Sequence, residues 1–508
     1  MFSTVSSAAL QGLQVEFVQV EADVSNGLPM FQMVGYLSSE VKEAGERVRT
    51  AIRNSSFQLP PKKVVVNLSP AYMRKRGTIF DLAIAVAVLI AMGEICKASI
   101  DSTLFVGELS LDGTVKAVNG ILPIVLAAKK KGYHQCIVPK DNQREGCLVN
   151  GIQVVGVSNL YEVYQYLKGE SRPVETNEAG IVVSQNYRYE DFSEIYGQQA
   201  AKRAVEIAVA GGHNILMVGP PGVGKTAIAK RIPGILPTLT FEEQLGLTQV
   251  YSILGEVNKD FPLVTERPFR EVNSSVTMAG ILGGGTYPKP GEISLAHKGV
   301  LFLDELAEFP RNVLESLRRP LEEHSIKIIR EKGEYVFPAD FLLVAAMNPC
   351  PCGNYPDLNR CICTQAQRQA YLSKLSQPFL DRIDICVDVP KVQYMDLRKV
   401  HYEESSETIR GRILKARRLQ DKRYRHTLIK TNAGLNMKFV EQYCVLGESE
   451  RKIMEQAYEK LGLSARTYCK VLSVARTIAD LDEKETIEGK HLREALSYRT
   501  MNVRESRC

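Results

Sequence analysis

Short apolar runs alternate with helical patterns along much of the chain, and this alternation predicts a mixed α/β protein. Three apolar runs near the middle have the length and composition of buried strands, and they cover residues 215–218, 300–303 and 341–347. A glycine-rich turn and a helical pattern follow the first run, and polar residues directly follow the other two. The pattern predicts strands whose ends carry functional side chains.

The chain divides into four parts by pattern. Residues 1–170 alternate strand-like and helix-like pieces between glycine-rich turns, which predicts a separate α+β domain. A polar stretch follows at 171–190 and predicts a linker. Residues 191–390 hold the three apolar runs and are expected to form an α/β core. Residues 391–508 contain a basic helical segment and then several amphipathic helices, which predict a helical lid.

Composition narrows the class of protein. With 508 residues, of which 44% are hydrophobic and 24% charged, the chain fits a globular protein of about three domains. Its longest apolar run, Leu82–Met92, is too short to span a membrane, and the N-terminus has no secretory pattern. Eleven cysteines without the spacing of a disulfide framework indicate a reducing compartment. We therefore expect a cytoplasmic protein with no membrane partner.

A phosphate-binding loop follows the first apolar run. Residues 219–226 match the motif G-x-x-x-x-G-K-[ST] at every fixed position. In order they are Gly219, Pro220, Pro221, Gly222, Val223, Gly224, Lys225 and Thr226. Glycines let the backbone wrap phosphate oxygens, and the helix that begins at Lys225 adds its positive N-terminal dipole. Lys225 is placed to reach the outer phosphates, and the Thr226 hydroxyl suits Mg²⁺. The motif predicts ATP and Mg²⁺ as ligands.

The other two apolar runs end in residues that suit phosphate chemistry. Asp304 and Glu305 follow the second run, where an Asp can hold Mg²⁺ and a Glu can orient or deprotonate the attacking water. Asn348 follows the third run and could contact the γ-phosphate or that water; the alternative is a turn residue at a strand end. Before the phosphate-binding loop, residues 191–199 either lie against the adenine or cap a core helix.

The order of these motifs resembles that of the AAA+ ATPases. Two further segments, 290–306 and 345–353, closely match the magnesium-chelatase subunit I branch of that class. Nearly the whole chain resembles the YifB/ComM family of magnesium-chelatase-like ATPases. The resemblance implies a homo-oligomeric, hexameric ring that uses ATP to thread or remodel single-stranded or branched DNA, with helicase or branch-migration activity in recombination or natural transformation.

The resemblance also assigns two arginines. Arg382, in a loop before a predicted strand at 385–389, would act on the nucleotide of a neighbouring subunit; the alternative is an ion pair with Asp381 or Asp384. Arg466 corresponds to the lid arginine that senses the γ-phosphate of its own subunit.

Two positions depart from related patterns. The first domain resembles the proteolytic domain of Lon proteases, but Ile79 and Ile124 stand about where Lon has its nucleophilic Ser and partner Lys. Thr78 and Lys75 are possible substitutes, yet a non-proteolytic domain is the expected form. In the ATPase part, Asn273-Ser274 replaces a His-His pair that the family usually carries.

Three surface features remain open. The insert Gly280–Pro290 would be a hairpin whose Tyr287 and Lys289 meet DNA, or a loop with no ligand. A C-x-C…C-x-C set could form a structural Zn²⁺ site, or consist of free thiols, and its members are Cys350, Cys352, Cys361 and Cys363. A basic run either faces DNA or is a solvated helix face, and it contains Arg410, Arg412, Lys415, Arg417, Arg418, Lys422, Arg423 and Arg425.

Three functions are compatible with these features. We expect an ATP-hydrolysing ring motor that acts on DNA. A chelatase-type motor that drives a protein partner is the first alternative, and a nucleotide-switched assembly scaffold is the second. DNA-stimulated ATP hydrolysis would favour the motor on DNA, because the other two have no use for DNA.

Overall fold

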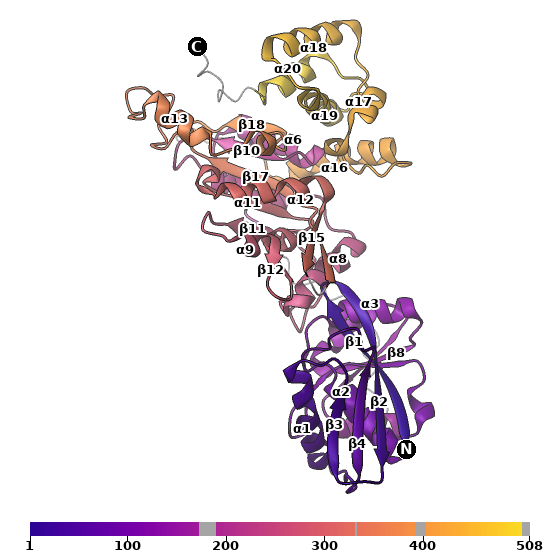
Figure 1. Ribbon diagram of the computed structural model, residues 1–508. Coiled ribbons are helices and arrows are strands. Elements are labelled where there is room, and N and C mark those ends of the chain that lie inside the picture. The colour runs from indigo at the N-terminus through magenta and orange to yellow at the C-terminus, as the bar shows by residue number, and fades with distance from the viewer. Residues whose placement is uncertain (172–188, 331–332, 392–402, 500–508) are drawn as a thin grey trace.

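The computed structural model describes residues 1–171, 189–330, 333–391 and 403–499. Figure 1 shows an elongated molecule with the N-terminal domain at one end, a central domain in the middle and a helical domain at the other end. Most of the predicted linker at 171–190 lies outside the described residues. No helix in the described part of the chain has both the length and the apolar character needed to cross a membrane.

The N-terminal domain is built on one mixed sheet in the order β3-β4-β2-β1-β5-β8-β9. Antiparallel pairing joins β1 to β2 and β2 to β4, while the remaining neighbours are parallel. The strands are β1 (Phe2–Gln11), β2 (Gln14–Ser25), β3 (Met30–Val34), β4 (Lys63–Ser69), β5 (Thr103–Phe105), β8 (Gln135–Pro139) and β9 (Gln153–Val157). A small hairpin of β6 (Glu108–Leu109) and β7 (Val115–Lys116) lies beside the sheet.

In its described residues, the N-terminal domain has five α-helices and two clusters of buried hydrophobic side chains. The helices are α1 (Ser39–Asn54), α2 (Asp81–Met92), α3 (Ile121–Lys131), α4 (Gln143–Gly146) and α5 (Leu160–Lys168). Every residue of α2 from Asp81 to Ala91 is buried, which explains the long apolar run in the sequence. Ile124 is buried in the second cluster and Ile79 packs against it. The two isoleucines therefore fill an apolar interior.

The central domain contains a fully parallel sheet in the order β11-β14-β17-β10-β18. Its strands are β11 (Phe269–Val272), β14 (Val300–Leu303), β17 (Leu342–Met347), β10 (Ile215–Val218) and β18 (Ile385–Asp388). Ile215 and Met217 belong to one buried cluster, whereas Leu216 and Val218 belong to the other. The alternation shows that both faces of the sheet are covered, as continuous apolar strands require. The predicted α/β core is confirmed.

Helices and two hairpins complete the central domain. The helices are α6 (Gln199–Gly211), α7 (Lys225–Ile235), α8 (Phe241–Leu254), α9 (Met278–Leu282), α10 (Glu292–Leu295), α11 (Arg311–Ser316), α12 (Arg318–Glu323), α13 (Gln365–Leu372) and α14 (Gln377–Leu380). One hairpin pairs β12 (Gly283–Gly284) with β13 (Lys289–Pro290), and the other pairs β15 (Ser325–Arg330) with β16 (Gly333–Pro338). The short β12–β13 pair lies within the predicted Gly280–Pro290 insert.

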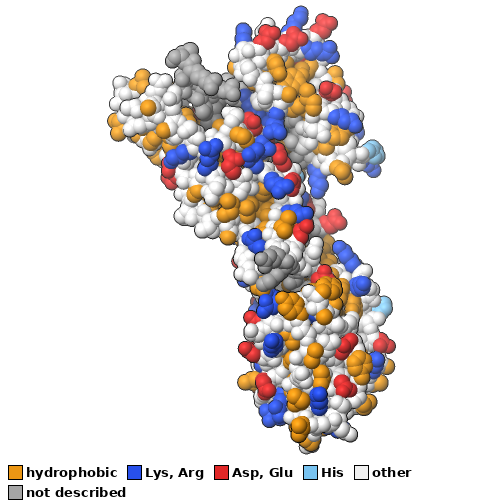
Figure 2. All heavy atoms as spheres, viewed as in Figure 1, with side chains coloured by type: hydrophobic (Ala, Val, Ile, Leu, Met, Phe, Trp, Pro, Cys, Tyr) orange, Lys and Arg blue, Asp and Glu red, His pale blue; other side chains and the backbone are white. Residues whose placement is uncertain are grey.

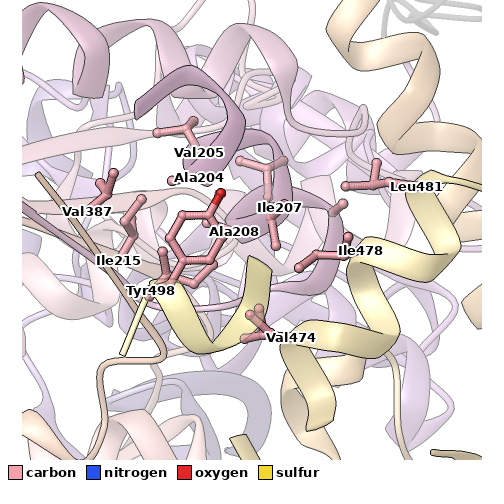
Figure 3. Close-up of a cluster of buried hydrophobic side chains, with 14 of the residues drawn as sticks. Ala204, Val205, Ile207, Ala208, Ile215, Val387, Val474, Ile478, Leu481 and Tyr498 are labelled. Atoms are coloured by element: carbon pink, nitrogen blue, oxygen red, sulfur yellow. The ribbon is translucent and has the colours of Figure 1, made fainter. Parts of the chain in front are cut away.

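The C-terminal domain is entirely helical in its described part. Its helices are α16 (Ser406–Tyr424), α17 (Met437–Tyr443), α18 (Glu448–Leu461), α19 (Ala465–Leu481) and α20 (Gly489–Ser497). Figure 3 shows side chains of α19 meeting those of α6, with Tyr498 between them and β10. At the centre of the helices, the buried Asp480 carboxylate accepts hydrogen bonds from Arg423, Arg476 and Asn432. This packing fixes where the lid sits on the core.

The N-terminal domain docks onto the insertions of the central domain. Helix α3 lies against α8, where the Gly120 N–H donates to the Ser252 carbonyl at 3.0 Å. The Ser252 hydroxyl donates to the Glu145 carboxylate at 2.5 Å. On the other side, Gly12 of the β1–β2 turn lies against Tyr335 and Phe337 of the β15–β16 hairpin. Buried polar and apolar contacts therefore join the two domains.

Candidate nucleotide site

The phosphate-binding loop lies at the carboxyl end of β10, which is paired on both sides, with β17 and with β18. Gly222 and Gly224 have φ values of 77° and 92°, a backbone region that glycine adopts without strain. A Cβ at Gly219 would lie 2.2 Å from the Val389 carbonyl oxygen, so the close approach of the two backbones also requires glycine there. Helix α7 begins at Lys225, directly after the loop. The loop therefore forms the expected cradle for an anion.

Lys225 lies across the mouth of this loop. Its ammonium group donates to the carbonyl oxygens of Gly219 at 2.6 Å and Pro220 at 2.9 Å. It also donates to the side-chain oxygen of Asn348 at 3.2 Å. Burial lowers the pKa of Lys225, while Asp304 and Glu305 act in the opposite direction. A buried cation with neutral partners is well suited to receive a phosphate.

The two residues expected to hold Mg²⁺ are in contact. The Thr226 hydroxyl donates to the Asp304 carboxylate at 2.9 Å, so two oxygen ligands of the type that Mg²⁺ prefers lie beside the phosphate loop. The next residue, Glu305, is exposed and has a φ of 51°. A non-glycine residue in this left-handed region is strained, and such strain is concentrated at functional sites. Glu305 is therefore exposed close to the end of β14.

The segment before α6 lies against the phosphate loop. The Gln198 side-chain amide donates to the carbonyl oxygens of Pro390 at 2.7 Å and Val223 at 3.4 Å. Phe192 is buried in the core cluster, whereas Tyr196 is exposed. The segment therefore anchors a core helix and contacts the phosphate loop, while its packing against an adenine stays a prediction.

Arg382 lies at the opposite side of the sheet from the phosphate loop, at the amino ends of the parallel strands. Its guanidinium pairs with the Glu322 carboxylate and donates to the Pro378 carbonyl at 2.9 Å. Neither carboxylate suggested by the sequence is its partner: Asp384 pairs with Lys470 and Asp381 accepts from Gln377. Glu322 was not identified from the sequence, because it lies sixty positions before Arg382 and carries no motif.

Arg382 and Arg466 line the same cavity of about 1440 Å³ between the core and the lid. The cavity is bordered by the residues at which the strands begin, including Asn214, Leu342 and Asp384. A four-residue strand is about 13 Å long, so this edge is well separated from the phosphate loop. The sequence predicted that Arg466 contacts the γ-phosphate of its own subunit, a contact that this position does not favour. The packing of α19 on α6 places Arg466 at the opposite edge instead.

The four cysteines converge. Among their sulfur atoms, Cys350 and Cys352 are 3.4 Å apart, Cys352 and Cys361 are 3.6 Å apart, and Cys350 and Cys361 are 3.8 Å apart. With Cys363, all four ligand atoms lie within 4.8 Å of one another, so the group could hold a metal ion. All cysteines in the described part of the chain are free.

The basic run on α16 is largely occupied by internal contacts. Arg412 pairs with Glu206 and Glu404, Lys415 with Glu483, and Arg423 with Asp480. Arg417 donates to the Val209 carbonyl at 2.7 Å, and burial lowers its pKa to about 10. Much of the run therefore anchors the lid. The exposed remainder comprises Arg418, Lys422 and Arg425, with Arg410 half-buried. Acidic side chains are interspersed with basic ones on the core and lid in Figure 2.

Two other sequence features have clear positions. Lys75 and Thr78, the residues considered as replacements for the protease Lys and Ser, have separate hydrogen-bond partners. Lys75 donates to the Pro70 carbonyl and Thr78 donates to the Glu108 carboxylate. Asn273 and Ser274 directly follow β11, the edge strand of the core sheet farthest from β18.

Three family models match successive parts of the chain. The model for magnesium chelatase subunit ChlI matches residues 191–397. A second model, for subunit ChlI of Mg-chelatase, matches residues 20–142. The model for the C-terminal part of magnesium chelatase subunit ChlI matches residues 403–499.

Known proteins resemble the chain over nearly its whole length. Competence protein ComM of Haemophilus influenzae is 43% identical over 503 residues, which cover 98% of this chain and 97% of ComM. The YifB protein of Escherichia coli is 42% identical over 506 residues, which cover 98% of this chain and 97% of YifB.

A third known protein is similar over only part of the chain. Lon protease 2 of Bacillus subtilis is 26% identical over 194 residues, which cover 33% of this chain and 34% of that protease.

We expect Glu305→Gln to lower ATP turnover by about 10² to 10⁴-fold while ATP binding persists, because the amide cannot take a proton from the attacking water. Steady-state hydrolysis and the binding of a fluorescent ATP analogue measure the two effects. Glu308→Gln is the matched control, since this exposed carboxylate only pairs with Lys374 on the surface. Unchanged turnover in Glu305→Gln would contradict the role of this carboxylate.

Proposed function

Because the chain belongs to the YifB/ComM family of magnesium-chelatase-like proteins, we propose that it is an ATP-hydrolysing AAA+ ring motor that acts on DNA. The observation that carries the proposal is similarity to a competence protein over 98% of the chain, combined with an intact phosphate loop. The proposed setting is the cytoplasm, with helicase or branch-migration activity in recombination or natural transformation.

The proposed ATP site gives each residue a separate task. The N–H groups of the loop from Gly219 to Gly224 and the Lys225 ammonium would bind the phosphates. Thr226 and Asp304 would hold Mg²⁺, which neutralises charge on the phosphate oxygens. Glu305 would orient or deprotonate the attacking water, and Asn348 would contact that water or the γ-phosphate. The hydrogen bond from Lys225 to Asn348 supports this grouping, since it joins the start of α7 to the residue that follows β17.

Arg382 and Arg466 support a ring. Both line a cavity at the amino ends of the core strands, away from the phosphate loop at their carboxyl ends. In the proposed hexamer this cavity would face the phosphate loop of a neighbour, so that both arginines act between subunits. Arg466 is exposed and forms no ion pair within the described residues, so its guanidinium is available for a phosphate. An arginine supplied in this way is typically worth about 10³ to 10⁵ in rate.

The N-terminal domain is proposed to be Lon-like and non-proteolytic. The partial similarity to a Lon protease supports the first part. Burial of Ile124 with Ile79 packed beside it, and the separate hydrogen bonds of Lys75 and Thr78, support the second.

We also propose that Cys350, Cys352, Cys361 and Cys363 bind a structural Zn²⁺. Four sulfurs at the corners of a tetrahedron around zinc, with Zn–S of about 2.3 Å, are about 3.8 Å apart. The three sulfur–sulfur separations among Cys350, Cys352 and Cys361, 3.4–3.8 Å, are close to this value. The loop rests on the phosphate loop, because a Cβ at Gly353 would lie 2.6 Å from Pro221. Zinc would therefore stiffen the loop that begins two residues after Asn348.

We expect single-stranded or branched DNA to stimulate steady-state ATP hydrolysis, and the stimulation to fade at higher salt because phosphate contacts release counter-ions. Lys225→Ala supplies the inactive control. Intact basal hydrolysis with no response to any DNA would contradict the proposal. In that case, stimulation by a protein alone would favour the chelatase-type motor, and very slow turnover with ATP-dependent assembly would favour the scaffold.

We expect about one zinc ion per purified chain, released when the thiols are modified and detected with a chromogenic chelator. The double variant Cys361→Ser/Cys363→Ser should lose the ion, and Cys96→Ser, which alters an exposed thiol elsewhere, should keep it. Zinc-free protein from zinc-supplemented medium, with all four thiols reduced, would contradict the assignment.

A further inference from the structure

A group of tyrosines and arginines gathers where the N-terminal domain meets the core. Tyr36 follows β3, and the segment from Tyr72 to Arg76 follows β4. Tyr287 comes from the β12–β13 turn of the central domain. Figure 1 shows β12 at the end of the core that meets the N-terminal domain. We call Tyr36, Tyr72, Arg74, Arg76 and Tyr287 the tyrosine–arginine surface.

A short parallel bridge orients the two arginines. The Lys75 N–H donates to the Tyr36 carbonyl at 2.9 Å, and the Ser38 N–H donates to the Lys75 carbonyl at 3.0 Å. Side chains alternate along extended backbone. Lys75 accordingly points inward and is fully buried, whereas Arg74 and Arg76 are turned the other way and are only partly buried. The bridge places two guanidinium groups on one side of the segment.

Each arginine meets a tyrosine ring from a different segment. The Arg74 guanidinium lies over the Tyr36 ring at 5.8 Å from its centre. The Arg76 guanidinium lies over the Tyr287 ring, so the surface continues across the boundary between the domains. These cation–π contacts hold flat groups in place without neutralising their charge.

The charge of the surface is incompletely balanced. Neither Arg74 nor Arg76 forms an ion pair with any described residue, and Arg74 Nε is buried there without a hydrogen-bond partner. Burial lowers the pKa of Arg76, and the like charge of Arg74 lowers it further. Glu40 is a nearby carboxylate, and the charges of Arg76 and Arg74 act on it. Glu40 is exposed, so water screens its opposition to an anion.

Two rings are open for stacking. The Tyr72 side chain is 80% exposed and Tyr36 is 51% exposed. Exposed aromatic rings beside positive charges are the components with which proteins bind single-stranded nucleic acid, because a base without a stacked neighbour offers its face to a ring and its phosphate to a cation. Duplex bases are already stacked and offer no such face.

We propose that the tyrosine–arginine surface binds single-stranded DNA, with bases stacked on Tyr72 and Tyr36 and phosphates paired with Arg74 and Arg76. The inference rests on the proposed action on DNA and adds a binding site shared by the N-terminal domain and the core. Tyr287 joins this site to the hairpin of the motor domain. DNA held there would couple the two domains directly.

The test is the fluorescence anisotropy of a labelled oligothymidine with the full-length protein. Tyr72→Ala should weaken binding by roughly 5- to 100-fold, the range typical for the loss of one stacked base, while Tyr72→Phe should bind as the wild type does. Arg74→Gln/Arg76→Gln should weaken binding and reduce the slope of log affinity against log salt by about one to two. Tyr161→Ala, with a 46% exposed ring elsewhere on the domain, is the control. Basal ATP hydrolysis should be unchanged in all variants, since none touches the nucleotide site.

The outcomes separate this inference from the function it rests on. If the wild type binds the oligonucleotide and the variants bind equally well, the tyrosine–arginine surface is not the site, and the motor proposal stands. If the wild type binds no DNA of any structure, the proposed action on DNA fails and the inference fails with it. An equal loss of duplex and single-strand binding in Tyr72→Ala would overturn the assignment to single strands.

Discussion

The parallel direction of all five core strands is the constraint on which the site depends. It brings the carboxyl ends of β10, β14 and β17 to one edge, so that Lys225, Asp304 and Asn348 meet although they are far apart in sequence. The same constraint puts the loop that precedes β18, with Arg382, at the other edge. A single chain therefore presents a phosphate loop at one edge and an arginine cavity at the other. In our proposal the ring is needed because only a neighbour joins the two.

Buried charges hold the lid in the position that keeps Arg466 away from the phosphate loop. Asp480 is fully buried among Arg423, Arg476 and Asn432, and Arg417 is held on the Val209 carbonyl. Removing one partner of such a network typically costs about 3–5 kcal/mol, because the remaining charge stays buried. The network fixes α19 against α16, and with it the position of Arg466. Arg417 and Arg423, which belong to the basic run considered for DNA binding, therefore hold the lid in place through internal contacts.

The local motifs of the nucleotide site were predictable from the sequence, because each is a short run whose backbone and side chains act together. The strand 215–218 and the contacts of Lys225, Thr226 and Asp304 follow from such runs. Long-range partners were not predictable. Glu322, which pairs with Arg382, and Glu206, which pairs with Arg412, have no local signal, since they depend on which helices pack together. Strand β1 has no clear sequence signal either, because its run of small Ser, Thr and Ala residues makes a weak hydrophobic pattern.

Completion of the site by a neighbouring subunit is the central claim, and mixed oligomers test it most directly. A chain with Lys225→Ala and a chain with Arg382→Ala should each be inactive alone. Mixed in equal amounts, they should regain ATP hydrolysis at up to about a quarter of the interfaces, because an intact loop then meets an intact arginine. Mixing Lys225→Ala with Asp304→Ala should restore nothing, since both residues belong to one edge of one chain. If neither mixture regained ATP hydrolysis although the subunits were shown to exchange, the claim that a neighbouring subunit completes the site would be wrong.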